Sequence, residues 1–140
     1  MKPENRTLTT DSPYYLDQDT YAVMRHYVLM YSRWNNEYNA LSHSVKSPSP
    51  EPLPPNGMIS DSTANLAERR ATLAGRMREI EETVHEVAPD IDSFLLYAVT
   101  TAGVSFEELE RMGISCSKRA YFRKRRQFYY ALAKKISFIA

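Results

Sequence analysis

The chain has 140 residues, with 18 lysines and arginines against 17 aspartates and glutamates, for a formal net charge of +1. Its 43% hydrophobic content predicts one modest core, either a single domain or a small domain with an arm. The one cysteine, Cys116, excludes a disulfide framework and a cysteine-based zinc site. No apolar run reaches the roughly 18–20 residues that span a bilayer, and no signal core follows Met1, so we expect a cytoplasmic protein without a membrane partner.

The near-neutral balance conceals a segregation of charge along the chain. Residues 1–110 hold nine basic residues and all 17 acidic ones, a net charge of −8. Residues 111–140 hold the other nine basic residues and no acidic one, a net charge of +9. Such asymmetry between segments points to a nucleic-acid or membrane partner. We expect the basic end to meet DNA, while the acidic body faces away and limits non-specific binding.

The first part of the chain predicts a lead-in, a helix and a linker. Residues 1–16 are polar and predict a flexible lead-in. Residues 17–45 contain no glycine or proline, and their apolar residues recur at steps of three and four, which predicts one long amphipathic helix. Residues 46–60 hold five of the eight prolines and predict an extended linker, with a proline-motif docking ligand as the alternative.

The remaining residues, 61–140, predict a helical bundle that ends in a helix-turn-helix. A helix from the caps near Asp61 to Ala88 carries a heptad-like apolar stripe, which fits either packing against the first helix or a dimer seam. A nearly apolar helix follows over residues 91–101. Because no useful segment alternates with a period of two, the predicted fold class is all-α.

Residues 104–136 carry the strongest local pattern. Ser105 and Glu108 form a capping box that opens a short helix, and Gly113 follows where a left-handed turn would require glycine. A serine, Ser115 or Ser117, then caps a long basic helix that begins near Lys118. A short helix, a tight turn and a capped basic helix together describe a helix-turn-helix, whose second helix lies in the major groove of DNA.

The predicted DNA-binding residues are the cap and the first turns of this helix. Four of them are placed to reach base edges: Lys118, Arg119, Tyr121 and Lys124. Ser117 would contact a phosphate or a base, and three arginines would bind phosphates: Arg123, Arg125 and Arg126.

The register of this helix and the role of its C-terminal part have two interpretations each. If Gly113 is the turn glycine, Arg119 falls at a position usually filled by an apolar residue, with Phe122 at the next such position. Either the register shifts by one or two residues, or the stem of Arg119 covers the core. The aromatic residues after Gln127 are expected to be core or interface, with stacking on single-stranded bases as the alternative.

The segment from Ile114 to Ile136 resembles the C-terminal signature of the RinA/ArpU-type transcriptional regulators of phages and prophages. That signature is a serine-capped helix rich in aromatic residues and arginines, which ends in a Leu-Ala-x-Lys pattern. Ala120 stands where the pattern has threonine. The resemblance implies a DNA-binding domain similar to the sigma-factor region that recognises the −35 promoter element. It also implies a late-operon activator that acts in a bacterial host cell, with RNA polymerase as a further partner.

No catalytic, cofactor-binding or metal-binding constellation is predicted, and the protein is not expected to be an enzyme. The four glycines form no phosphate loop, and the three histidines lack metal-ligand spacing. The main hypothesis is a sequence-specific, DNA-binding transcriptional regulator, either monomeric or a homodimer. The alternatives are a small-terminase-like DNA-packaging adaptor and a helical module that binds a protein such as RNA polymerase.

Overall fold

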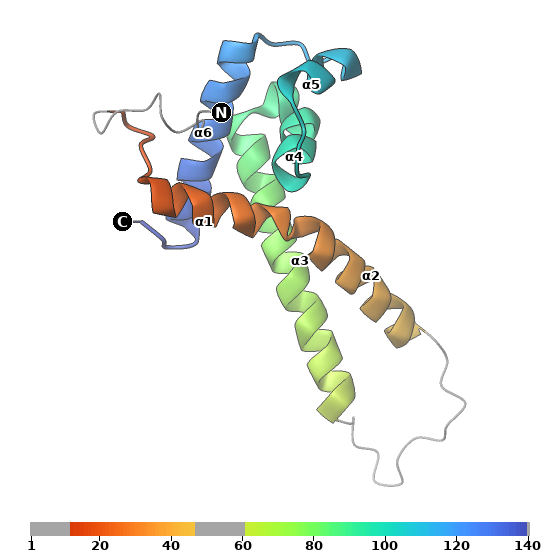
Figure 1. Ribbon diagram of the computed structural model, residues 1–140. Coiled ribbons are helices and arrows are strands. Elements are labelled where there is room, and N and C mark those ends of the chain that lie inside the picture. Colours follow the sequence, from red (N-terminus) through yellow and green to blue (C-terminus); the bar gives the residue numbers. More distant parts are fainter. Residues whose placement is uncertain (1–11, 47–60, 140) are drawn as a thin grey trace, which may run out of the picture.

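The computed structural model of the protein describes residues 12–46 and 61–139, which form an all-α fold with no strand in these ranges (Figure 1). The helices, in chain order, are α1 (Gln18–Leu29), α2 (Tyr31–Lys46), α3 (Asp61–Val87), α4 (Asp92–Thr100), α5 (Phe106–Met112) and α6 (Lys118–Lys135). A short 3-10 helix, Pro89–Ile91, lies between α3 and α4. The all-α prediction is therefore confirmed. Residues 1–11 of the predicted lead-in and 47–60 of the proline-rich linker lie outside the described residues. The rest of the lead-in, residues 12–16, is not flexible as predicted, because it forms a turn and Leu16 is buried in the core.

The helix predicted over residues 17–45 is divided in two at Met30. Asp17 caps its start, because the Asp17 carboxylate accepts a hydrogen bond from the Thr20 amide at 2.6 Å. At Met30 the backbone has ψ −11°, and the Met30 amide donates to the Tyr27 carbonyl three residues earlier. The bend lets α1 pack on α4 and α6 while α2 follows α3. Figure 1 shows this change of direction between α1 and α2.

The helices α2 and α3 run antiparallel and form an arm that extends from the rest of the molecule (Figure 1). Trp34 of α2 is buried, as are Leu73 and Met77 of α3, and the Arg76 guanidinium lies 5.5 Å from the centre of the Trp34 ring. The apolar stripe of α3 is therefore buried within a single chain, as the first of the two sequence interpretations expected.

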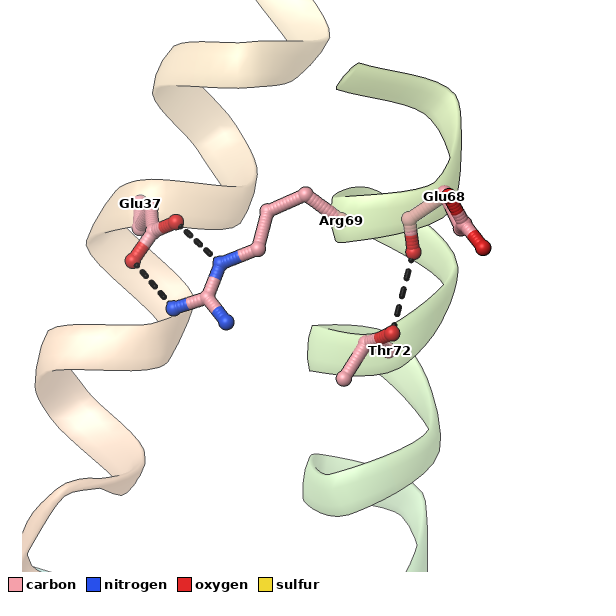
Figure 2. Close-up of polar contacts among 4 residues, drawn as sticks. All are labelled: Glu37, Glu68, Arg69 and Thr72. Atoms are coloured by element: carbon pink, nitrogen blue, oxygen red, sulfur yellow. Dashed lines mark hydrogen bonds and ion pairs between the residues drawn. The ribbon is translucent and has the colours of Figure 1, made fainter. Parts of the chain in front are cut away.

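Two consecutive arginines of α3 connect it to α2 near the far end of the arm. Arg69 makes a two-point contact with Glu37, with Nε 2.6 Å from Oε2 and Nη2 3.1 Å from Oε1 (Figure 2). Arg70 donates to the Tyr38 hydroxyl at 3.0 Å, and its guanidinium lies over the Tyr38 ring. Such paired, planar contacts add geometric specificity to the apolar packing of the two helices.

The core lies where α1, α3, α4 and α6 meet. The inward face of α6 contributes Phe128, Tyr129 and Leu132, all fully buried. The Tyr129 ring packs edge-on against the Tyr21 ring of α1, with centroids 5.2 Å apart. Because one face of α6 is held in this way, its opposite face is directed outward.

Candidate nucleic-acid interface

The short helix α5 begins and ends as its sequence predicts. The Ser105 hydroxyl accepts a hydrogen bond from the Glu108 amide at 3.2 Å, which caps the helix. Gly113 follows with φ +100°, a conformation that favours glycine. The Ile114 amide donates to the Leu109 carbonyl, and the Gly113 amide donates to the Glu110 carbonyl, both at 3.0 Å. These two bonds are the Schellman arrangement that closes a helix C-terminus.

The cap of α6 is Ser117, not Ser115. The Ser117 hydroxyl accepts a hydrogen bond from the Ala120 amide at 3.1 Å, and the helix begins at Lys118. The first buried side chain of α6 is Tyr121, two residues after Arg119, which is exposed. Of the two interpretations of the register, the shift by two residues is therefore the one observed. Arg119 extends into solvent rather than over the core.

Tyr121 is a core residue, and its predicted contact with a base edge is wrong. Its side chain is 1% exposed and packs between the rings of Phe106 and Phe122, at centroid distances of 5.6 and 5.0 Å. Arg125, one turn later, lies on the same inward face. It donates to the Tyr121 hydroxyl at 3.4 Å, and its guanidinium lies 5.8 Å from the centre of the Tyr129 ring. A half-buried arginine held in this way is poorly placed to bind a phosphate, so the structure does not favour the phosphate contact predicted for Arg125.

Three of the predicted residues share one outward face of α6: Arg119, Arg123 and Arg126, which we call the arginine stripe. Their spacing of four and three residues places them in line over about 10 Å of helix. Arg119 and Arg123 are exposed and Arg126 is half-buried. In the part of the chain that the structure describes, no carboxylate pairs with any of them. Positive charge is therefore available on this face.

One lysine at each end of α6 differs from the stripe, because it has an acidic neighbour. Lys118 Nζ lies 3.4 Å from Glu107 Oε1 of α5, and Lys135 Nζ lies 2.9 Å from Glu86 Oε1 of α3. A backbone hydrogen bond of Glu107 and the neighbouring Lys118 together hold the pKa of the Glu107 carboxyl below its usual range. Lys124 is half-buried on the flank of the helix. Among the described residues, the positive charge of α6 without a carboxylate partner thus includes the arginine stripe and, at the far end of the helix, the exposed Lys134.

The first turn of α6 is charged against its helix dipole. It contains no acidic residue, and it begins with Lys118 and Arg119. Cations near a helix N-terminus destabilise it, typically by about 0.3–1 kcal/mol each at low ionic strength. The Glu107 carboxylate offsets the charge of Lys118, but helix stability does not explain Arg119, whereas an anionic ligand in front of this turn would.

Two residues near α6 were not singled out from the sequence. Glu107 has no role among the sequence predictions, yet it contacts Lys118. Arg25 of α1 lines a small pocket of about 80 Å³ together with Arg125 and residues 101–104. Both relationships join residues from different elements, so periodicity within one helix could not have revealed them.

The described residues hold no group of three or more histidine, cysteine, aspartate or glutamate side chains placed to bind a metal ion. Cys116 lies half-buried in the turn before α6, and burial raises the pKa of its thiol, the opposite of what an activated nucleophile needs. Across residues 12–46 and 61–139, no helix has the length and apolar character needed to cross a bilayer.

No known protein family, curated protein or solved structure matches the chain. The chemistry of the surface formed by α5 and α6 is therefore the basis for assigning a function.

Proposed function

We propose that the protein is a sequence-specific, DNA-binding transcriptional regulator whose recognition helix is α6. The observation that carries this proposal is the arginine stripe. Three arginines lie in line on the outward face of a serine-capped helix, without carboxylate partners among the described residues. The inward face of the same helix is closed by aromatic packing. A rigidly held helix with one cationic face is the form that enters the major groove.

Each outward residue has a distinct role in this proposal. Arg119, in the first turn, reaches a base edge, where a guanidinium can bind guanine O6 and N7 together. Arg123 and Arg126 bind phosphates, which supplies affinity and sets the position of the helix but does not select a sequence. Lys124, which the sequence predicts at a base edge, is half-buried on the flank of the helix, and we assign it a phosphate contact instead. The hydroxyl of Ser117 caps the helix and also lies at this surface.

The biological setting we propose follows from the resemblance of residues 114–136 to phage regulators of the RinA/ArpU type. The protein would control phage or prophage genes in a bacterial host and would contact RNA polymerase at the promoter. The excess of acidic residues before residue 111 supports this orientation, because it keeps the body of the protein away from the duplex.

Fluorescence anisotropy with labelled duplexes across a salt series tests the proposal. The unmodified protein should bind duplex DNA, with log affinity falling linearly with log salt concentration. Arg123→Gln and Arg126→Gln should each weaken binding to all duplexes and reduce the slope by about one. Arg78→Gln is the matched control, because Arg78 is exposed on α3. An unmodified protein that binds no duplex at low salt would refute the proposal.

A further inference from the structure

Among the residues that the structure describes, the carboxylate in contact with the first turn of α6 is that of Glu107, the second residue of α5. It lies 3.4 Å from Lys118 Nζ, and both side chains are largely exposed, at 58% and 61%. Arg111, one turn further along α5, also acts electrostatically on Glu107. An acidic side chain thus lies between two cations at the edge of the surface proposed to meet DNA.

We propose that Glu107 is a specificity-determining residue, which directs Lys118 toward base edges and away from phosphates. This inference rests on the proposed function. A phosphate that approaches Lys118 must also approach Glu107, so repulsion between the two anions offsets much of the attraction to the lysine. A base edge such as guanine O6 and N7 accepts a hydrogen bond but carries no net charge. The carboxylate therefore penalises a phosphate contact far more than a base contact.

The consequence is a larger difference between specific and non-specific affinity. Non-specific binding depends almost entirely on phosphate contacts, whereas a specific complex also uses base edges. Glu107 therefore lowers the affinity that comes from phosphate contacts and leaves the affinity that comes from base contacts nearly unchanged. A like-charge element that discriminates against unwanted partners is a common route to specificity.

The experiment compares Glu107→Gln with Glu110→Gln, an equally exposed carboxylate one turn along α5 that makes no contact with Lys118. The unmodified protein is first used to select a tightly bound duplex from a random pool. The affinity of each protein is then measured by anisotropy for this selected duplex and for a scrambled duplex. Glu107→Gln should raise affinity for the scrambled duplex about 3- to 10-fold and steepen its salt slope by about one. Affinity for the selected duplex should change by less than about 3-fold, so that the specificity ratio falls.

A double-mutant cycle with Lys118→Met establishes whether Glu107 acts through Lys118. In the Lys118→Met background, Glu107→Gln should leave the specificity ratio unchanged. The inference is overturned if Glu107→Gln and Glu110→Gln change both affinities alike, or if the effect of Glu107→Gln persists without Lys118. If the unmodified protein binds duplexes and Glu107→Gln does nothing, this inference alone is lost. If the unmodified protein binds no duplex, the proposed function is lost as well.

Discussion

The ring of Tyr121 lies 5.6 Å from the ring of Phe106, centroid to centroid, and this contact joins α5 to the first turns of α6. Both side chains are buried, and they come from the two helices of the helix-turn-helix. The relative orientation of α5 and α6 thus depends on aromatic packing at this point. The same contact removes Tyr121 from the surface available to DNA.

We therefore expect Tyr121→Ala to lower the free energy of unfolding by about 3–5 kcal/mol, as for other large aromatic side chains in cores. Tyr121→Phe, which loses only the hydroxyl bonded to Arg125, should cost about 1 kcal/mol or less. Urea denaturation measures both, with Arg123→Ala as an exposed control expected to change stability by at most about 0.5 kcal/mol. A Tyr121→Ala protein of normal stability with altered sequence preference would contradict this assignment.

Two glycines should respond in opposite directions to alanine. Gly113 has φ +100°, so Gly113→Ala should destabilise the protein by about 1–2 kcal/mol. Gly75 lies in the middle of α3, where an added Cβ would meet nothing within 4 Å. Gly75→Ala should therefore stabilise the protein by about 0.5–1 kcal/mol. Thermal melts of the two variants give the signs directly, and a Gly113→Ala protein more stable than the unmodified one would show that the turn at Gly113 is not as described.

Arg119→Glu should raise the stability of the protein while weakening its proposed binding to DNA. The substitution places a negative charge in the first turn of α6, where it favours the helix dipole, and we expect a gain of about 0.3–1 kcal/mol in unfolding free energy. The same change puts an anion where the proposed function places a base edge and nearby phosphates, so duplex affinity should fall at least about tenfold. Chemical denaturation and anisotropy on one protein sample measure both. Lost stability together with retained binding would count against the proposed role of Arg119.

The contact between Glu37 and Arg69 predicts that acid weakens the arm. Hydrogen bonds from Arg69 hold the pKa of Glu37 below the ordinary value of 4.5. The folded protein therefore binds this proton less readily than the unfolded chain does. The stabilisation is fully present above the ordinary pKa and is lost as the pH falls through the folded value.

Denaturation across pH 2–7 tests this dependence. The stability difference between the unmodified protein and Glu37→Gln should shrink below about pH 4.5. Glu68→Gln is a control from the same region of the arm, since Glu68 contacts Thr72 only through its backbone carbonyl (Figure 2). A difference that stayed constant with pH would mean that the pair does not form in solution.

The helix ends were predictable from the sequence because their signals are local. Ser105, Gly113 and the proline after α3 each act on the backbone within a few residues. The division at Met30 was not predictable, because it arises from the different packing partners of α1 and α2. No glycine or proline marks that position.

The prediction of the outward face of α6 was partly right for a geometric reason. Each residue turns a helix by about 100°, so an uncertainty of two residues in the turn before Lys118 rotates every later side chain by about 200°. Arg119, Arg123 and Arg126 lie outward, whereas Tyr121 and Arg125 lie inward. Which residues of α6 face outward depends on the length of the turn before Lys118, and the periodicity of the sequence does not specify that length.

The packing of α6 against α1 has a consequence for protein engineering. Tyr129 and Tyr130 of α6 contact Tyr21 and Tyr14, which precede them by more than a hundred residues. A graft of residues 104–136 onto another scaffold would transfer the side chains of α6 but leave those aromatic faces uncovered. The pair α5 and α6 therefore cannot be transferred alone, and a chimera would also need the segment from Tyr14 through α1 to keep α6 in its native orientation.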